Sequence, residues 1–222
     1  GAYTHAGPEI GVASTKAFTS QLLVLFMIGL KTGYSKGNIS KKRFHKLITE
    51  IQNLPKKIQT IFKDLKKIEK IAYHIYEKNN CLFMGRGNNF PVALEGALKL
   101  KEISYIHAQG YPAAELKHGP IALIDKEMPA IVICTKSKEY KKMISNIQEI
   151  KSRKAITIGI IDEKNIEVKN ILDHHIVVPT TKADFSPIIN IVPLQLLSYY
   201  IAKLRGCDVD KPRNLAKSVT VE

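Results

Sequence analysis

The sequence predicts an α/β fold in which a parallel β-sheet is covered by helices on both faces. From residue 80 onward, short apolar segments alternate with longer segments of helical periodicity, which is the pattern of βαβ units. The preceding part is almost entirely helical. Because right-handed crossovers place loops at the carboxyl ends of parallel strands, we expect ligands to bind at that edge of the sheet.

The N-terminal part is predicted to consist of helices joined by short loops. Residues 1–10 have the composition of a strand-to-helix loop, and Ser14 or Thr15 is expected to cap a helix that ends near residue 32. A second helix is expected from about residue 40 to 61, and a third over residues 62–79. Apolar residues recur at helical spacing in these segments, so each helix should pack one face against a core.

Four later segments have the length and composition of buried strands, and three segments between or after them have helical periodicity. The expected strands are residues 81–84, 130–134, 155–161 and 174–178. The expected helices are residues 91–105, 139–151 and 187–204. Residues 106–114 are expected to be irregular, residues 115–120 to form a turn, and the final stretch from residue 206 has no clear periodicity.

Composition narrows the class of protein. The chain has 222 residues, 45% of them hydrophobic, which suits one large domain and part of another. No apolar run is expected to reach the roughly 18 residues of a membrane span, and the longest run, residues 22–30, has the length of a core helix. No signal peptide opens the chain, and Cys81, Cys134 and Cys207 fit neither a disulfide framework nor a zinc pattern. We therefore expect a cytoplasmic protein.

The net charge of +14 raises the question of nucleic-acid binding. Arginine, the preferred reader of bases and phosphates, supplies only five of the 34 basic residues, and the basic residues are spread along the chain. None of the common nucleic-acid-binding motifs is present. We expect a solvated, lysine-rich surface that attracts anionic substrates, and neither a nucleic-acid nor a membrane partner.

The segment from Pro91 to Tyr105 carries the strongest sign of chemistry. It has Pro91 in its first turn and is apolar on most of its circumference, as buried helices are. Glu95, Lys99 and Glu102 nevertheless share one narrow stripe, at spacings i, i+4 and i+7. Ionisable groups are costly to bury unless they are paired or used. A carboxylate beside a lysine can shuttle protons, and the alternative is a self-compensating charged stripe on a solvated face.

Other candidate residues have plainer alternatives. Residues 85–87 (Gly-Arg-Gly) resemble the start of a dinucleotide-binding turn, but Phe90 stands at the third glycine position, so the alternative is a tight strand–helix turn. His118, in a turn after the carboxylate helix, can carry protons near neutral pH. Lys217, near the C-terminus, can form a Schiff base with a carbonyl compound if it is desolvated. His174-His175 has no carboxylate or cysteine at metal spacing, so no metal site is expected.

Five sequence blocks together resemble the glutamine:fructose-6-phosphate amidotransferase family, also called the glucosamine-6-phosphate synthases. The blocks are GVASTKAF at 11–18, GRG at 85–87, ALEGALKLKEISYIH at 93–107, ELKHGP at 115–120 and PRNLAKSVTVE at 212–222. The resemblance covers essentially the whole chain, but only the C-terminal part of that family.

The resemblance implies a domain division. Members of the family have two sugar isomerase (SIS) domains, each a flavodoxin-like, three-layer α/β/α sandwich with a parallel sheet. Residues 1–63 are expected to be the mostly helical C-terminal remnant of the first SIS domain, and residues 64–206 the second SIS domain. Residues 207–222 are expected to form an active-site tail.

The resemblance also implies roles for individual residues. Glu102 resembles the residue that moves a proton between sugar C1 and C2, and Lys99 resembles the lysine beside it. His118 resembles the residue assigned to ring opening, which the neighbouring subunit of a homodimer supplies. Lys217 resembles the lysine that forms a Schiff base with the open-chain sugar. Sugar contacts are expected at Val12, Ser14 and the backbone near Ala216.

The implied reaction makes glucosamine 6-phosphate and glutamate from fructose 6-phosphate and glutamine, with no metal or organic cofactor. The family's phosphate-binding loop, of the form S-x-S-G-x-T, and its glutaminase domain have no counterpart here. We therefore expect a fragment with little or no activity of its own. The alternatives are a non-catalytic SIS module that senses sugar phosphates and a related sugar-phosphate deglycase or isomerase.

Overall fold

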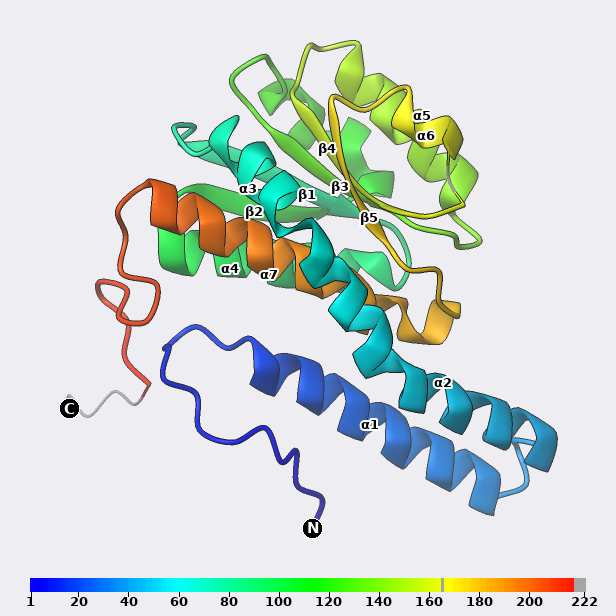
Figure 1. Ribbon diagram of the computed structural model, residues 1–222. Helices are drawn as coiled ribbons and strands as arrows, with labels where there is room; N and C mark the ends of the chain where they lie inside the picture. Colours follow the sequence, from blue (N-terminus) through cyan, green and yellow to red (C-terminus); the bar gives the residue numbers. More distant parts are fainter. Residues whose placement is uncertain (165, 218–222) are drawn as a thin grey trace.

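A computed structural model describes residues 1–164 and 166–217, and a five-stranded parallel sheet lies at its centre (Figure 1). The strands are β1 (Asn80–Gly85), β2 (His107–Pro112), β3 (Ala130–Cys134), β4 (Thr157–Asp162) and β5 (His174–Val178). They lie in the order β2-β1-β3-β4-β5, which reverses direction between β1 and β3. This is the flavodoxin-like order of doubly wound sheets, so the predicted α/β fold is confirmed.

Helices cover both faces of the sheet (Figure 1). Helices α3, α4 and α7 lie on one face, and α5 with the short α6 lies on the other. Helices α1 and α2 run side by side and extend beyond the sheet on the α7 side (Figure 1). The helices are α1 (Lys16–Ser35), α2 (Lys41–Ile61), α3 (Leu65–Tyr73), α4 (Asn89–Ser104), α5 (Tyr140–Lys151), α6 (Ile166–Lys169) and α7 (Ser186–Leu204). Short 3-10 helices are Phe62–Asp64, Ala113–His118, Pro120–Leu123 and Ala183–Phe185.

Two hydrophobic cores form because successive side chains of each strand point to opposite faces of the sheet. In β1, Phe83 packs in the core shared with α4 and α7, whereas Leu82 and Met84 pack in the core beneath α5. All three side chains are buried. A strand buried on both faces needs a continuous apolar run rather than an alternating one, which explains the sequence of β1.

Two glycines allow α4 to approach the sheet closely. A Cβ atom on Gly85, the last residue of β1, would lie 2.2 Å from the carbonyl oxygen of Asn89. A Cβ atom on Gly96 would lie 2.7 Å from Leu194 of α7 and 3.0 Å from Phe83 of β1. The glycines therefore set the depth of α4 in the fold, and with it the position of the charged stripe that α4 carries.

The prediction of an irregular segment over residues 106–114 is wrong, because residues 107–112 form the edge strand β2. Its side chains do not alternate between apolar and polar as in a half-buried strand, and most of them are not fully buried. The strand is held by pairing with β1 along its whole length, from His107 opposite Asn80 to Pro112 opposite Gly85. An edge strand stabilised mainly by backbone pairing leaves little signal in the sequence.

The helix predicted over residues 62–79 is too long. Helix α3 ends at Tyr73, and the chain then turns toward β1. The guanidinium of Arg205 donates hydrogen bonds to the carbonyl oxygens of Tyr76 (2.6 Å) and Lys78 (3.4 Å). These carbonyls are satisfied by a side chain that follows α7 rather than by a longer helix, which the local sequence could not reveal.

The segment Ala183–Leu204, which includes α7, is long and apolar enough to span a membrane by length and composition. The prediction that no segment of this kind exists is therefore wrong. In the fold, 72% of its apolar window is buried inside the protein. Helix α7 packs against α3 and α4, as the central helix of a globular domain does.

Candidate active site

A buried lysine between two carboxylates marks the middle of α4. The side chain of Lys99 is only 4% exposed, and its Nζ lies 2.5 Å from Oε2 of Glu102 and 3.5 Å from Oε1 of Glu95. The predicted stripe is thus a half-buried charge cluster rather than a solvated face. Breaking one side of such a cluster leaves a buried charge without compensation, so the three groups stabilise each other's positions.

The two carboxylates of the cluster are not equivalent. Burial raises the pKa of Glu95, and the negative charge of Glu102 adds to this, while the ammonium of Lys99 opposes it. Oε2 of Glu102 is buried and, within the described residues, accepts no hydrogen bond of good geometry besides its ion pair with Lys99. Of the side chains that the structure describes, Lys99 alone therefore holds Oε2 of Glu102, and the Glu102 side chain is 22% exposed, so a ligand group can reach this carboxylate.

Glu9 organises the segment that faces α4. Its Oε1 accepts hydrogen bonds from the backbone N–H groups of Thr15 (3.0 Å) and Ala17 (3.1 Å) at the start of α1. The predicted side-chain cap from Ser14 or Thr15 is therefore wrong, since Thr15 makes no side-chain cap bond and Glu9 takes this role. Burial raises the pKa of Glu9, but these hydrogen bonds and the charge of Lys217 outweigh it and lower the pKa below its usual value.

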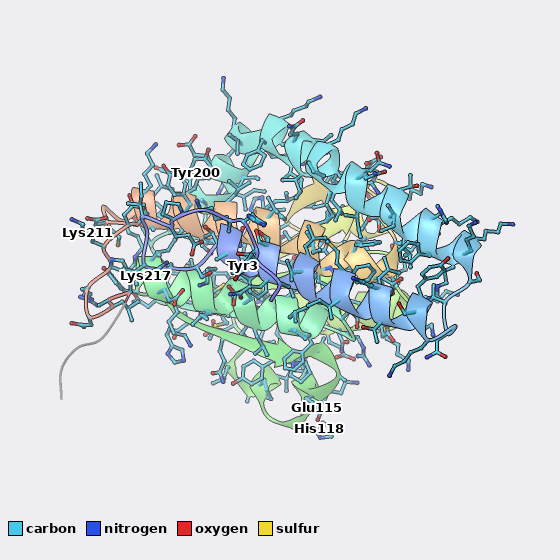
Figure 2. All side chains as sticks on the ribbon, turned by 90° about the horizontal axis from the view of Figure 1, so that it is seen from below. Tyr3, Glu115, His118, Tyr200, Lys211 and Lys217 are labelled. Atoms are coloured by element: carbon cyan, nitrogen blue, oxygen red, sulfur yellow. The ribbon has the colours of Figure 1, made fainter. Side chains whose placement is uncertain are left out.

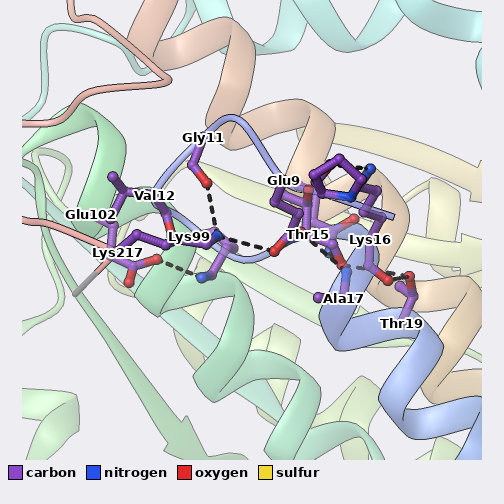
Figure 3. A network of polar contacts seen from close by, with 12 residues as sticks. Glu9, Gly11, Val12, Thr15, Lys16, Ala17, Thr19, Lys99, Glu102 and Lys217 are labelled. Carbon is purple, nitrogen blue, oxygen red and sulfur yellow. Dashed lines mark hydrogen bonds and ion pairs between the residues drawn. The ribbon is translucent and has the colours of Figure 1, made fainter. Parts of the chain in front are cut away.

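Lys217 reaches the same segment from the other end of the chain (Figure 3). Its Nζ donates hydrogen bonds to the carbonyl oxygen of Gly11 (2.9 Å), to Oε2 of Glu9 (3.2 Å) and to the carbonyl oxygen of Val12 (3.4 Å). The side chain is 51% exposed, so the amine is partly accessible. These hydrogen bonds hold Lys217, which lies on a tail without regular structure, against the N-terminal segment.

The tail itself is held at the C-terminal end of α4. The backbone N–H of Arg213 donates to the hydroxyl oxygen of Tyr105 (2.8 Å), and the guanidinium of Arg213 lies 4.1 Å from the centre of the Tyr105 ring. Tyr105 has a φ of 63°, a left-handed conformation that is uncommon for a bulky residue. The tail also contacts the N-terminal segment, where the N–H of Val12 donates to the carbonyl oxygen of Asp210 (3.0 Å). Helix α4, the N-terminal segment and the tail thus meet at one place.

A cavity of about 340 Å³ opens where these elements meet. Lys99 and Ile103 of α4 line it, together with Gln195 and Tyr199 of α7. The N-terminal segment and the tail contribute Pro8, Glu9, Ile10, Gly11, Ala13, Thr15, Lys16, Val209 and Asp210. The volume is within the range of small-molecule sites. Two of the three acceptors of the Lys217 amine, Glu9 and Gly11, belong to this lining.

The structure brings most of the predicted site residues together, but not His118. Val12 and the half-buried Ser14 lie in the N-terminal segment, and Ala216 immediately precedes Lys217 in the tail. The side chain of His118 is 75% exposed and lies near Glu115, 4.0 Å away, at a part of the surface remote from Lys217 (Figure 2). Within one chain, His118 therefore cannot act on a molecule in this cavity.

The carboxyl edge of the sheet, where we expected ligands, is filled by protein groups. Nδ2 of Asn190 donates to Oδ1 of Asn89 (2.9 Å) and to Oγ1 of Thr135 (3.0 Å), and all three side chains are buried. These residues lie at the point where the strand order reverses between β1 and β3. The cavity instead lies between α4, α7, the N-terminal segment and the tail.

No metal site is formed by the described side chains. Over residues 1–164 and 166–217, no group of three or more His, Cys, Asp or Glu side chains is arranged to hold a metal ion. At the start of β5, the ring of His174 stacks on that of His74 with 4.5 Å between centroids. Burial, and to a smaller extent the neighbouring imidazole of His74, lowers the pKa of His174.

The fold and this site define the class of protein: a doubly wound α/β domain with a lysine-containing cavity lined by α4, α7 and the two ends of the chain. The chain belongs to the SIS domain family, whose pattern matches residues 74–205. The flavodoxin-like sandwich predicted from the resemblance is thus confirmed.

The most similar relatives include aminotransferases and a deaminase. The chain is 55% identical over 223 aligned residues to the glutamine–fructose-6-phosphate aminotransferase (isomerizing) of Chlorobaculum tepidum, with 100% of this chain and 36% of the relative covered. Its structure matches the C-terminal domain of glucosamine-fructose-6-phosphate aminotransferase from Francisella tularensis with a TM-score of 0.87 and 39% identity, covering 92% of this chain and 58% of that one. Glucosamine-6-phosphate deaminase from Thermotoga maritima matches with a TM-score of 0.71 and 26% identity, covering 94% and 58%. The chain spans about a third of the length of the curated relative.

Proposed function

We propose that this chain supplies the isomerase side of a glutamine–fructose-6-phosphate aminotransferase, which makes glucosamine 6-phosphate and glutamate from fructose 6-phosphate and glutamine. One observation carries the proposal: Lys99, which lines the cavity, forms an ion pair with Glu102, and the amine of Lys217 is bound by two other lining residues, Glu9 and Gly11. The named relatives, similar along the whole chain, support the same reaction.

In this proposal each residue has a role that its surroundings allow. The amine of Lys217 captures the open-chain ketose: a C–N bond forms at the carbonyl carbon, and the carbonyl oxygen leaves as water. Glu102 moves a proton between sugar C1 and C2, because a partly exposed carboxylate can accept and return it. Lys99 holds Glu102 in place through its ion pair. Val12, Ser14 and the backbone at Ala216 contact the sugar.

The cavity is one part of the complete site in this proposal. We expect the sugar phosphate group to bind a Ser/Thr-rich loop in the upstream region of the full-length enzyme, and ammonia to come from its glutaminase domain. His118 opens the sugar ring from the second subunit of a homodimer, which agrees with its remote position in the single chain. The enzyme acts in the cytoplasm and uses no metal or organic cofactor.

The chain is also proposed to comprise three parts: residues 1–63 from a first SIS domain, 64–206 as the second, and 207–222 as an active-site tail. The junction of all three at the cavity supports this division, because α1, α4 and the tail are held together there by Glu9, Tyr105 and Lys217. Residues 218–222 of the proposed tail lie outside the described residues.

Joining this chain to the upstream part of the Chlorobaculum tepidum relative tests the function. The fusion should form glucosamine 6-phosphate from fructose 6-phosphate and glutamine, and the change Glu102→Gln should abolish this without unfolding the protein. The 222-residue chain alone should convert little or no fructose 6-phosphate to glucose 6-phosphate. Rapid conversion by the chain alone, or an active Glu102→Gln fusion, would contradict the proposal.

A second candidate function follows from the likeness to the Thermotoga maritima deaminase. The same carboxylate and lysine chemistry can run toward release of ammonia from glucosamine 6-phosphate. The fusion separates the two functions: glutamine-dependent synthesis supports the aminotransferase, whereas deamination without net use of glutamine supports the alternative. A non-catalytic sensor would show neither reaction.

A further inference from the structure

We propose that Glu9 is a positioning residue, which holds the amine of Lys217 at the edge of the cavity by coupling the C-terminal tail to the start of α1. The inference rests on the proposed function in so far as Lys217 captures the sugar carbonyl. The sequence context of Glu9, an acidic residue five or six positions before a predicted helix cap, gave no sign of this role.

The two carboxylate oxygens of Glu9 have separate tasks. Oε1 accepts the N–H groups of Thr15 and Ala17, at 3.0 and 3.1 Å, which fixes the carboxylate on the first turn of α1. Oε2 is left to face the tail and accepts from Nζ of Lys217 at 3.2 Å. The side chain of Glu9 is only 9% exposed, so it has little freedom to turn away. The partner that meets Lys217 is therefore rigid.

Lys217, in contrast, needs an external constraint. It lies on a segment without regular structure, its side chain is 51% exposed, and lysine has a long and flexible side chain. A single exposed ion pair constrains a lysine weakly. Here the carbonyl oxygens of Gly11 and Val12 accept from the same Nζ, at 2.9 and 3.4 Å, so three acceptors from one short segment enclose the amine.

This arrangement sets where a carbonyl compound can react. The acceptors Glu9 and Gly11 line the same cavity as Lys99, so an amine bound to them stands at the cavity edge. Without the carboxylate, the amine keeps only neutral acceptors and should sample more positions. Correct placement of a nucleophile contributes strongly to rate, so loss of Glu9 should lower the rate of carbonyl capture more than it alters substrate affinity.

The accessibility of the amine can be measured on the chain as it stands. Glu9→Gln keeps an oxygen for the N–H groups of Thr15 and Ala17 but removes the charge that faces Lys217. Acetylation by an amine reagent, followed by peptide mass spectrometry, should label Lys217 about two- to five-fold faster in this variant, the range that a surface ion pair contributes. Lys211, exposed in the same tail, serves as the internal control and should not change.

Lys16→Gln is the matched control variant, because it also removes a charged contact of this segment, the 2.7 Å hydrogen bond from Lys16 to the carbonyl oxygen of Pro8. It should leave the labelling of Lys217 unchanged. Equal labelling of Lys217 in Glu9→Gln and the unaltered chain would overturn the proposal. So would an equal increase in Lys16→Gln, since the effect would then reflect general loosening of the segment.

The kinetic test uses the fusion with the upstream part of the relative. With fructose 6-phosphate and cyanoborohydride, Glu9→Gln should trap the sugar on Lys217 about 10- to 100-fold more slowly at saturating substrate, with a smaller change in KM, and Glu9→Asp should restore part of the rate. If the unaltered fusion traps no sugar on Lys217, the proposed role of Lys217 in carbonyl capture is wrong. The labelling experiment still tests whether Glu9 restrains the Lys217 amine. If it traps sugar and Glu9→Gln does so equally fast, Glu9 is not a positioning residue.

Discussion

Lys99 is enclosed by two carboxylates that come from its own helix, and this arrangement determines how each of the three residues behaves. A lysine that is 4% exposed requires compensation, and Glu95 and Glu102 supply more negative charge than Lys99 neutralises. The negative charge of the two carboxylates that Lys99 does not neutralise remains at the side of α4 that faces the N-terminal segment. The partly exposed carboxylate of Glu102 is held 2.5 Å from the ammonium of Lys99.

Glu102→Gln tests the proton-transfer role. The amide keeps the shape of the side chain but cannot accept and return a proton, so kcat of the fusion should fall by about 10²- to 10⁴-fold, the usual contribution of a general acid–base group. Product formation measured by coupled assay gives the value. Glu163→Gln, at an exposed carboxylate after β4, is the control and should keep full activity. A comparable loss in both variants would point to misfolding instead.

Lys99→Met tests the charge cluster itself. The variant leaves two partly buried carboxylates without their cation, and this should lower the free energy of unfolding at pH 7 by about 3 kcal/mol. The pKa of Glu95 is already raised in the fold by burial, so its contribution to stability is present below its usual pKa of 4.5 and is lost as pH rises through its folded value.

The deficit of Lys99→Met should therefore shrink as the pH is lowered from 7 to 5, because the carboxylates can then become neutral by binding protons. Urea unfolding of the variant and the unaltered chain at both pH values measures this. A deficit that stays constant or grows toward pH 5 would show that the cluster is not electrostatically coupled as described.

At the scale of the element, α4 depends on close packing more than on helix propensity. Gly96 lies where a Cβ atom would come within 2.7 Å of Leu194 and 3.0 Å of Phe83. Gly96→Ala should therefore destabilise the protein by about 1–3 kcal/mol through overpacking. Gly29→Ala in α1 is the matched control: nothing lies within 4 Å of its Cβ position, so alanine should stabilise by up to about 1 kcal/mol. Chemical denaturation should show a lower free energy of unfolding for Gly96→Ala and a higher one for Gly29→Ala. A stabilising Gly96→Ala would contradict the packing described.

Sequence patterns predicted those elements whose residues are locally consistent with their structure. The buried strands β1, β3 and β4 are largely apolar, and the partly buried β5 ends in three apolar residues. The stripe of Glu95, Lys99 and Glu102 follows from helical spacing alone. Strand β2 was missed because its stability comes from pairing with β1. Glu9 was missed because its partners, the start of α1 and Lys217, are fixed by tertiary structure. Lys217 was a candidate for Schiff-base chemistry from its residue type, but only the family resemblance assigned it to the same site as Glu102.

At the scale of the whole molecule, the site lies where the two ends of the chain meet α4. The sheet and its two cores provide the support, and the point where the strand order reverses is closed by Asn89, Thr135 and Asn190. His118 lies on another part of the surface, 4.0 Å from Glu115. A complete site therefore requires a second subunit if His118 takes part in the reaction.

Mixing two inactive variants of the fusion tests this arrangement. Glu102→Gln and His118→Ala homodimers should each be nearly inactive, whereas mixed dimers contain one intact site formed by the unaltered halves of the two subunits. After random exchange of subunits, about a quarter of the unaltered activity should return, because half of the dimers are mixed and each has one good site of two. No recovery, with exchange confirmed by native mass spectrometry, would place His118 outside the site or in the same chain as Glu102.

The most direct test of the central claim is chemical trapping of the sugar on the fusion protein. Incubation with fructose 6-phosphate and cyanoborohydride, followed by peptide mass spectrometry, identifies the residue that forms the imine. The account predicts one dominant adduct on Lys217, which lies beside the cavity that Lys99 lines. An adduct on Lys99 or on another lysine, or none while the fusion makes glucosamine 6-phosphate, would contradict it.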